Sequence, residues 1–248
     1  MNAPGFDPDT LERLVPHRLT DDALSRATLE LHLERYRFAA AHCLPGRVLD
    51  IACGVGYGSA CLAGRREDVQ ITGVDLSPEA IRFAREHYAS DRVVFEVGDA
   101  MAFSSPHRFG SIVSLETVEH LPDPAGFVAG LVPLLEAGGR FIASVPTTPS
   151  VDGNPHHLHD FTRRKLHRLV APFGFTEIAS FPQVQPFGLR SVLTRGESRT
   201  KDVRRNLPAY YLRHPGSLAR RIASTLRHGF ANLYLTVAWR APGGERGT

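Results

Sequence analysis

The chain has 248 residues, of which 42% are hydrophobic and 22% are charged; this suits one α/β domain with an elaboration and excludes a largely disordered protein. Its three cysteines lie in the first quarter of the chain, and their odd number fits no disulfide framework, so reduced thiols and a cytoplasmic protein are predicted. The N-terminus lacks the basic-then-apolar order of a signal peptide, and no run reaches the roughly 18 apolar residues of a membrane span.

Helical and strand patterns alternate along the chain. Apolar residues that recur at three and four predict helices, and short apolar runs between turn residues predict strands. The predicted helices cover residues 21–43, the stretch ending at 63, 77–88, 124–135, 161–171 and 217–227. The predicted strands cover residues 47–51, 69–74, 93–97, 110–114, 140–145, 177–182 and 232–238. This alternation predicts an α/β fold with a doubly wound, mostly parallel sheet.

Positive charge is concentrated in one stretch near the C-terminus. Residues 186–230 contain ten Lys and Arg against two acidic residues, a local charge of +8, which leaves −5 for the rest of the chain. Such a stretch can attract phosphates, nucleic acid or an anionic membrane surface, or be only a solvated surface. We expect a single domain over 1–248, with an N-terminal helical cap at 1–44 and a basic insertion at 185–230 that forms a cap or an interface, such as that of a homodimer.

A glycine-rich turn follows the first predicted strand. Gly54 and Gly56 let the backbone turn tightly and approach a ligand without an intervening Cβ atom. The third glycine of a dinucleotide fingerprint would fall at position 59, which holds Ser59. Asp50, at the start of the turn, would repel a pyrophosphate and suits a ligand that carries an ammonium group.

Two further carboxylates follow the next two predicted strands. Asp75 comes nineteen residues after Gly56, where it can accept hydrogen bonds from both ribose hydroxyls of a nucleoside. Asp99 follows the third strand, where it can accept from an adenine amino group. Acidic residues after three successive strands, together with a glycine turn, predict a nucleoside with a positively charged tail, which is S-adenosylmethionine.

Four segments, VLDIACGVGYGSACLA, GVDLSPEAI, VGDA and LLEAGGRFIASVP, together resemble the class I S-adenosylmethionine-dependent methyltransferases over residues 48–146. The resemblance implies a Rossmann-like, seven-stranded sheet whose last strand is antiparallel. It places Asp75 on the ribose and Asp99 on the adenine, and Ala52 stands where the family usually has its first glycine. The expected cofactor-binding residues are Asp50, Ala52, Gly54, Gly56, Asp75, Leu76, Asp99 and Ala100, with Arg35 and Tyr36 from the N-terminal helix.

The segment LETVEH, residues 115–120, follows the fourth predicted strand, where family members place groups that meet the methyl acceptor. If a helical turn begins after Ser114, then Glu116, Glu119 and His120 are spaced i, i+3 and i+4 and share one face. Two carboxylates there would raise each other's pKa, and a divalent cation between them removes the conflict. Carboxylate oxygens suit Mg²⁺, although histidine keeps Mn²⁺ or Fe²⁺ open.

A histidine-rich loop follows the fifth predicted strand, whose carboxyl end lies beside that of the fourth. The Glu-x-x-Glu-His block resembles that of ubiquinone-pathway O-methyltransferases and of small-RNA 3′-terminal 2′-O-methyltransferases, which pair it with a histidine from a later loop. The resemblance implies that Glu116, Glu119, His120 and His157 are metal ligands, with His156 as the alternative fourth ligand. Without a metal, His120 could act as a general base, and the cluster could also be structural.

The acceptor is predicted from two weaker patterns. The N-terminal helix, with His32, Arg35 and Tyr36, and the NP-H segment at 154–157 resemble bacterial methyltransferases of glycan and glycoconjugate pathways. These patterns predict metal-assisted O-methylation of a vicinal diol in a saccharide acceptor, which could be phosphorylated or lipid-linked. A catechol or other phenolic acceptor, a terminal ribose of RNA and a non-catalytic binding protein are the alternatives, and no nucleic-acid-binding module is visible.

Overall fold

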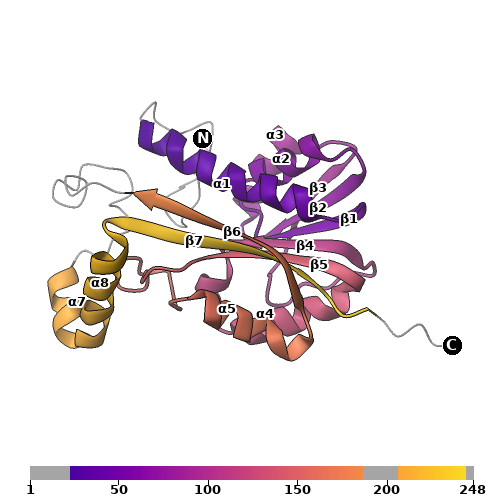
Figure 1. Cartoon of the computed structure of the whole chain (residues 1–248). Coiled ribbons are helices and arrows are strands. Elements are labelled where there is room, and N and C mark those ends of the chain that lie inside the picture. Colours follow the sequence, from indigo (N-terminus) through magenta and orange to yellow (C-terminus); the bar gives the residue numbers. More distant parts are fainter. Residues whose placement is uncertain (1–22, 187–205, 244–248) are drawn as a thin grey trace.

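The computed structural model describes residues 23–186 and 206–243, which form a layered α/β structure around one central sheet (Figure 1). Within these residues the sheet has seven strands in the order β3-β2-β1-β4-β5-β7-β6. The strands are β1 (Gly46–Ile51), β2 (Val69–Asp75), β3 (Val93–Val97), β4 (Phe109–Leu115), β5 (Leu135–Pro146), β6 (Thr176–Pro186) and β7 (Ala231–Arg240). The first five strands are parallel, and β7 runs antiparallel between β5 and β6. The predicted fold, with its antiparallel last strand, is confirmed.

Helices cover both faces of the sheet. The described helices are α1 (Ala23–His42), α2 (Tyr57–Arg65), α3 (Pro78–Tyr88), α4 (Pro124–Leu131), α5 (Arg163–Val170), α7 (Leu207–Arg213) and α8 (Pro215–His228). Helices α1, α2 and α3 lie on one face and α4 and α5 on the other, whereas α7 and α8 lie beyond one end of the sheet (Figure 1). No helix in the described part of the chain is long and apolar enough to cross a membrane.

The core consists of two apolar layers, one on each face of the sheet. Consecutive residues of a strand point to opposite faces, so Ile112 packs in the cluster with Phe127 of α4, and Val113 packs in the cluster with Leu62 of α2. Every residue of β4 from Phe109 to Ser114 is buried. Burial on both faces explains why the inner strands are continuous apolar runs without alternation.

Two helix boundaries illustrate the local rules. From the residue types, a serine followed by a proline predicts a helix start at 77–78, and this is confirmed: Ser77 caps α3 by accepting a hydrogen bond from the Ala80 N–H at 3.2 Å, and Pro78 takes the first helical position. Helix α4 ends at Leu131 instead of continuing to residue 135, and a 3-10 turn follows it. The reason is Pro133, which has no N–H to donate and whose ring crowds the preceding turn. Strand β5 accordingly begins at Leu135, five residues earlier than predicted.

The basic insertion lies between two strands that are direct partners. Pro186 at the end of β6 faces Ala231 at the start of β7, so the chain leaves the sheet and returns at the same point. Residues 206–230 of the insertion form α7 and α8. Residues 187–205, with six of its ten basic residues including Arg204 and Arg205, lie outside the described residues, as does the predicted start of the first helix at residues 21 and 22.

Candidate active site

The predicted site residues gather at the carboxyl ends of β1, β2 and β4. From β1 the chain winds outward through β2 and β3, and then returns to place β4 on the other side of β1. Ligands of doubly wound sheets bind in the crevice at such a reversal of winding. The glycine turn after β1, Asp75 after β2 and the LETVEH segment after β4 therefore border one crevice.

The glycine turn adopts backbone conformations that are uncommon for L-residues. Gly54 and Gly56 have φ angles of 59° and 87°, and a Cβ atom on Gly56 would come within 2.7 Å of the Cβ atom of Ala84. Ala52, which stands where the family usually has a glycine, has a φ of 63°. The left-handed conformation costs an L-residue roughly 1–2 kcal/mol. The conformation of the turn is thus locally unfavourable at Ala52, and contacts with the rest of the protein must stabilise it.

Asp75 connects the glycine turn to helix α3. Its Oδ2 atom accepts from the Gly54 N–H, and its Oδ1 atom accepts from the Ser77 N–H, each at 2.9 Å. A carboxylate offers about four lone-pair sites, so these two bonds do not by themselves exhaust its capacity. The side chain is buried at the crevice, and its role on a ribose stays a prediction.

Three residues after β2 and β3 border the adenosine side of the predicted site. The Leu76 side chain, next to Asp75, is 64% exposed, which is unusual for a leucine. Asp99 accepts from the Met101 N–H at 2.9 Å, and Ala100 packs at the edge of the core. An exposed leucine next to Asp75 offers an apolar face of the kind that a purine ring would cover, and the roles of Leu76, Asp99 and Ala100 stay predictions.

Asp50 lies deeper than the sequence suggested. It is buried, its Oδ2 atom accepts from the Ser59 hydroxyl at 2.6 Å, and the Tyr36 hydroxyl donates to Oδ1 at 3.4 Å. Burial raises the pKa of Asp50 to about 7, although the hydrogen bonds from Ser59 and Tyr36 oppose the rise. Tyr36 also lies directly over the turn, because a Cβ atom on Gly58 would come within 2.0 Å of its ring. A contact of Asp50 with an ammonium group stays a prediction.

Arg35 is enclosed by the protein. Its Nε atom donates to Gln183 at 2.7 Å, its guanidinium lies 4.2 Å from the centre of the Tyr234 ring, and an Nη atom lies 3.6 Å from Glu116. The side chain is almost fully buried. The guanidinium therefore already has partners within the protein, and the expected role of Arg35 in cofactor binding stays a prediction.

Glu116 does not join the other predicted metal ligands. No helical turn starts after Ser114; the 3-10 turn η3 covers only Val118–His120, and Glu116 has a left-handed φ of 50°. Its carboxylate accepts from the Ser144 hydroxyl at 2.7 Å and lies beside Arg35. The shared helical face of Glu116, Glu119 and His120 is therefore absent, because the chain reverses at Glu116 before the turn begins.

The structure brings together three of the four predicted metal ligands. Ligand atoms of Glu119, His120 and His157 all lie within 4.8 Å of one another, with Glu119 and His157 buried and His120 half-buried. Backbone hydrogen bonds produce this approach, since the N–H groups of Leu158 and His159 donate to the Glu119 carbonyl at 2.8 and 3.3 Å. The histidine loop is thereby joined to the 3-10 turn that carries the other two side chains.

The remaining histidines of the loop have structural partners. The His156 carbonyl lies 3.1 Å from Nδ1 of His120; a carbonyl only accepts, so Nδ1 carries the proton and Nε2 carries the lone pair. Nε2 of His159 lies 2.9 Å from the Leu121 carbonyl, and the His156 side chain is exposed. Of the loop histidines, His157 is therefore the one whose side chain meets Glu119 and His120. His32, singled out in α1, lies 3.1 Å from the Tyr57 hydroxyl.

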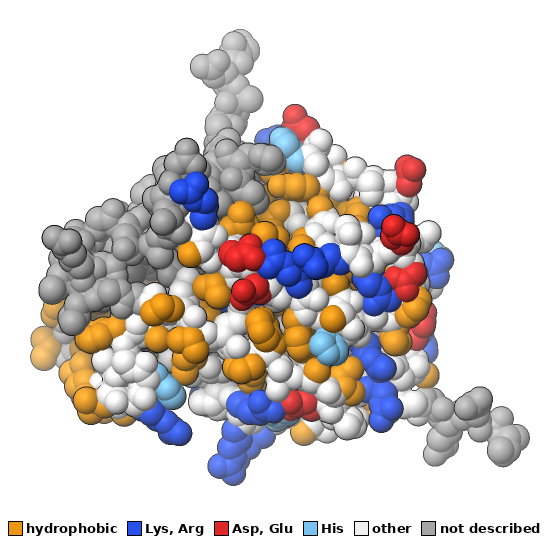
Figure 2. Space-filling view, turned by 45° about the horizontal axis from the view of Figure 1, so that its top comes forward, with side chains coloured by type: hydrophobic (Ala, Val, Ile, Leu, Met, Phe, Trp, Pro, Cys, Tyr) orange, Lys and Arg blue, Asp and Glu red, His pale blue; other side chains and the backbone are white. Residues whose placement is uncertain are grey.

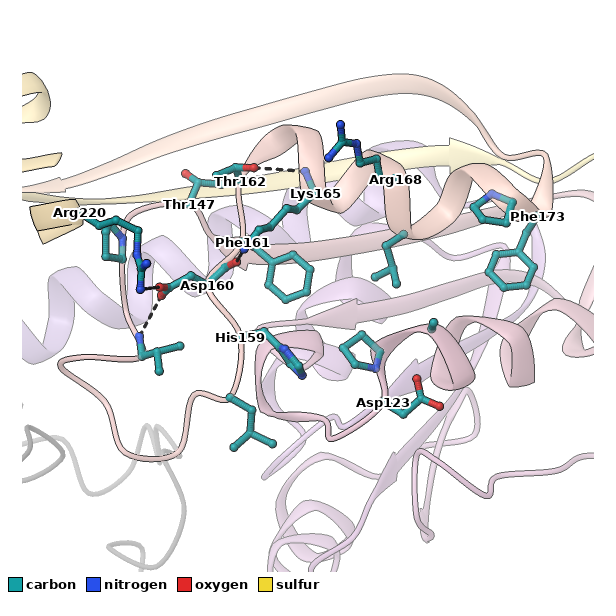
Figure 3. A pocket seen from close by; sticks show the side chains of 17 residues that line it. Asp123, Thr147, His159, Asp160, Phe161, Thr162, Lys165, Arg168, Phe173 and Arg220 are labelled. Carbon is teal, nitrogen blue, oxygen red and sulfur yellow. Dashed lines mark hydrogen bonds and ion pairs between the residues drawn. The ribbon is translucent and has the colours of Figure 1, made fainter. Parts of the chain in front are cut away.

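A groove of about 1070 Å³ opens on the other side of the histidine loop (Figure 3). Apolar side chains, among them Phe161, Leu169 and Phe173, form much of its wall. Lys165, Arg168 and Arg220 bring positive charge to it, and Arg220 lies 3.8 Å from Asp160. His159 and Leu158 also line the groove, so it adjoins the residues that hold the histidine loop in place.

Several supporting residues could not be found from the sequence. Asp152 is buried in the loop after β5, where Arg221 of α8 and Tyr211 of α7 donate to its Oδ2 atom at 2.8 and 2.6 Å. Gln183 and Tyr234, which enclose Arg35, come from β6 and β7. Each is an ordinary polar residue in its own segment, and only the tertiary structure brings it to its partner, so no local signal identifies it.

Residues 45–172 match the model of a family described as methyltransferase domain. The ubiquinone biosynthesis O-methyltransferase of Xanthomonas campestris pv. campestris (strain B100) is 37% identical over 119 residues, which are 45% of this chain and 48% of that protein. The chain thus spans about half the length of the curated relatives it matches.

Solved structures share the fold at low sequence identity. A protein from Bacillus halodurans C-125 aligns with a TM-score of 0.65 and 18% identity, over 85% of this chain and 98% of its own. The N-methyltransferase NodS from Bradyrhizobium japonicum WM9, solved with S-adenosyl-L-homocysteine, aligns with a TM-score of 0.59 and 18% identity, over 92% of each chain.

Proposed function

This chain belongs to the methyltransferase-domain family, and we propose that it transfers the methyl group of S-adenosylmethionine to a hydroxyl of a vicinal diol with the help of a divalent cation. The observation that carries the proposal is the approach of Glu119, His120 and His157 to within 4.8 Å of one another. This group follows β4, at the crevice that the glycine turn and Asp75 border from β1 and β2.

The cofactor proposal rests on the residues after β1, β2 and β3. Asp75 offers carboxylate oxygens to the ribose, Leu76 an apolar face to the adenine, and Asp99 an acceptor for the adenine amino group. The turn at Gly54 and Gly56 lets the methionine part approach the backbone. S-adenosylmethionine supplies an electrophilic methyl group on a sulfonium centre, and NodS, a fold relative, was solved with the demethylated product.

The donor set determines which cation fits. With Glu116 paired to Ser144 and Arg35, the group contains one carboxylate and two imidazoles instead of the two carboxylates first expected. Mg²⁺ prefers oxygen ligands, and imidazole suits Fe²⁺ and Zn²⁺. Mn²⁺ takes carboxylate oxygens as Mg²⁺ does but binds imidazole more strongly than Mg²⁺, so it fits a mixed set of one carboxylate and two imidazoles. We therefore favour Mn²⁺ over Mg²⁺. Glu119, His120 and His157 would hold the ion, and the Nδ1 contact of His120 with the His156 carbonyl orients its Nε2 lone pair.

The chain's own residues would position and activate the acceptor. A bound cation would lower the pKa of a coordinated hydroxyl, which is its contribution to the chemistry. The bonds between the Glu119 carbonyl and the histidine loop fix the distance between the 3-10 turn and His157. Holding the acceptor oxygen in line with the methyl group lowers the entropic part of the activation barrier, because the two substrates are already brought together. Direct displacement needs no covalent intermediate on the protein.

We favour a saccharide or glycoconjugate as the acceptor, whose diol would meet Glu119, His120 and His157. The groove of Figure 3, with its apolar wall, three basic and two acidic side chains, adjoins the histidine loop and would take a further part of a phosphorylated or lipid-linked acceptor. A catechol is the second candidate. It is favoured by the likeness to the ubiquinone biosynthesis O-methyltransferase of Xanthomonas campestris and by Phe161 and Phe173 in the groove, which suit an aromatic ring. A homodimer and the division of the chain at residues 44 and 185 stay predictions.

Reduced thiols support a cytoplasmic location. Cys43 and Cys53 are buried, Cys61 is partly buried, and none of the three forms a disulfide. Burial raises the pKa of Cys43 to about 12, which keeps this thiol protonated and unreactive.

Metal binding can be measured without an acceptor. Calorimetric titration with Mn²⁺ should show one site in the wild type and none in His157→Ala. His159→Ala is the matched control from the same loop, because its ring contacts the Leu121 carbonyl, and it should bind Mn²⁺ as the wild type does. Equal Mn²⁺ binding by both variants would contradict the proposed ligand set.

Activity is then tested on a panel of sugars, catechols and short RNAs. Chelation by EDTA should abolish methyl transfer, Mn²⁺ should restore it better than Mg²⁺, and Glu119→Ala should lose transfer while still binding S-adenosylmethionine. Full activity in chelator, together with an inactive His120→Ala, would instead assign His120 as a metal-free general base. Methylation of RNA alone would replace the small-molecule acceptor by a terminal ribose.

A further inference from the structure

The hairpin of α7 and α8, residues 206–230, exposes large apolar side chains at one end of the molecule. Leu212 is 86% and Leu226 83% exposed, and Leu218, Ile222 and Phe230 are also exposed. In Figure 2 hydrophobic and basic side chains lie side by side at the lower left, the end at which Figure 1 shows α7 and α8. Contiguous exposed apolar side chains of this size indicate an interaction surface.

The solvent-exposed side of α8 carries one row of apolar side chains and one row of basic side chains. Leu218, Ile222 and Leu226 are four residues apart and form one exposed stripe, and Arg220 and Arg227, seven residues apart, form a second stripe on the exposed side. The opposite side of α8 faces the protein, where Arg221 donates to Asp152. The hairpin therefore presents its apolar side outward while a buried ion pair holds its inner side.

The charge of this surface has one sign. Residues 206–230 contain four arginines and two histidines but no aspartate or glutamate. Arg213 and Arg227 are exposed, and Arg220 donates to the Ser217 hydroxyl at 3.0 Å and lies 3.8 Å from Asp160. An anionic layer that accepts both arginines and aliphatic side chains is the complementary partner.

We propose that α7 and α8 form a surface that lies on an anionic membrane. An interfacial helix buries its apolar side at the boundary between headgroups and acyl chains, while basic side chains at its edge reach the phosphates. Each basic residue near an anionic surface strengthens binding about fivefold. An apolar groove on another protein could bind the exposed leucines equally well. The neighbouring arginines, with no acidic residue among residues 206–230, favour the phosphate headgroups of an anionic membrane. This inference does not depend on the proposed methyl transfer.

The membrane surface and the groove are connected through Arg220, which lies on α8 and lines the groove. A protein that lies on a bilayer through α8 would hold the groove close to the headgroups. This placement suits an acceptor that is itself anchored in the membrane.

Co-sedimentation of the full chain with vesicles tests the proposal. The anionic vesicles contain phosphatidylcholine and about 30% phosphatidylglycerol, which is on the order of the anionic content of bacterial or cytoplasmic leaflets. These vesicles should bind the wild type, and vesicles of pure phosphatidylcholine should bind it at least tenfold more weakly. The double variant Leu212→Ser/Leu226→Ser should lose binding to both kinds of vesicle. Arg213→Ala/Arg227→Ala should weaken binding to the anionic vesicles by about 25-fold, with Arg82→Ala and Val94→Ser as controls for an exposed arginine and an exposed valine elsewhere.

Sedimentation velocity without vesicles tests whether the exposed surface of α7 and α8 binds a second copy of the chain instead of a membrane. A wild type that binds no vesicles at low salt would overturn the proposal, as would binding that the leucine variant retains in full. Self-association that Leu212→Ser/Leu226→Ser abolishes, without vesicle binding, would assign the surface to a second copy of the chain. Unchanged circular dichroism and cofactor affinity of the variants show that they are folded.

Discussion

A buried carboxyl group with a raised pKa, that of Asp50, makes the stability of the protein depend on pH. Burial penalises the charged form of Asp50 and raises its pKa to about 7, although the hydrogen bonds that it accepts from Ser59 and Tyr36 act in the opposite direction. The group is therefore protonated in the folded protein at pH values where it is ionised in the unfolded chain.

The sign of the pH dependence follows from this difference. Between about pH 4 and 7 the folded state binds more protons than the unfolded state, so the contribution of Asp50 to stability is largest at low pH and is lost as the pH rises through 7. The free energy of unfolding of the wild type, taken relative to Asp50→Asn, should fall by about 3 kcal/mol from pH 4 to pH 8. Urea unfolding at each pH measures it, and Asp91→Asn, which removes an exposed carboxylate, corrects for net charge. If the difference in the free energy of unfolding between the wild type and Asp50→Asn did not change with pH, the raised pKa would be contradicted.

Asp75 gives a second prediction for a single residue. Asp75→Ala should weaken binding of S-adenosylmethionine by about 1–3 kcal/mol, because it removes the proposed bonds to the ribose. Calorimetry measures the affinity. Ser77→Ala is the control, since it removes the cap of α3, at about 1 kcal/mol of stability, and an exposed bond to Glu79, but keeps the backbone N–H that Asp75 binds, and should leave cofactor affinity unchanged. Unchanged affinity in Asp75→Ala would refute the ribose assignment.

At this scale the sequence identified residue types better than side-chain directions. Glu119, His120 and His157 could be predicted because charged groups of this kind after strands of a parallel sheet meet at one edge. Glu116 was misplaced because its left-handed backbone is set by contacts with Ser144 and Arg35, which are distant in sequence. Such contacts leave no local pattern.

At the scale of elements, the ion pair of Asp152 and Arg221 holds the α7–α8 hairpin against the loop after β5. Burial alone would raise the pKa of Asp152, but the hydrogen bonds from Arg221 and Tyr211 outweigh it and hold that pKa below its usual range. Arg221 also donates to the Pro149 carbonyl at 2.6 Å. The loop that leads to the histidines is thus fixed from the side of the insertion.

Removing this ion pair should loosen the hairpin more than the rest of the molecule. Asp152→Ala deletes bonds to charged groups worth about 1.5–3 kcal/mol each, so amide hydrogen exchange in α7 and α8 should accelerate by about 10–100-fold. Exchange in the central strands should change little. Arg220→Ala breaks an exposed pair at 3.8 Å, worth less than about 1 kcal/mol, and serves as the control. Equal acceleration in both variants would show that Asp152 does not hold the hairpin.

Element boundaries were predicted where local chemistry determines them. Ser77 and Pro78 gave the start of α3 correctly, because the cap and the fixed φ of proline act within four residues. Helix α4 was predicted too long because the apolar pattern continued past Pro133. The register of β5 against β4, which shifts between Phe109 and Ser111, depends on pairing and cannot be read from one strand.

The whole molecule combines a sheet that the sequence predicted with an insertion whose placement it did not. Alternating apolar runs and the resemblance to methyltransferases fixed the sheet and its antiparallel strand, both of which are confirmed. The position of the hairpin beside the histidine loop depends on Asp152, Arg221 and Tyr211, and charge composition alone does not give it.

Replacing residues 187–230 by an Asn-Gly turn should preserve the sheet, because Pro186 and Ala231 are already antiparallel partners and two-residue turns join such strands. We expect unchanged affinity for S-adenosylmethionine and a KM at least tenfold higher for whichever acceptor of the panel is methylated. Calorimetry and steady-state kinetics measure the two quantities. A narrower variant, Arg204→Glu/Arg205→Glu, tests the basic charge alone. Indifference of KM to both changes and to salt would make the insertion a solvated surface.

The enclosure of Arg35 has a consequence for the order in which the protein can be completed during synthesis. Its partners Gln183 and Tyr234 are translated about 150 and 200 residues after it. A nascent chain that ends before β6 exposes α1 with a cation that lacks both contacts. Domains of this size fold while they emerge from the ribosome, so α1 can pack on α2 early, whereas the enclosure of Arg35 is completed only when β6 and β7 have been made.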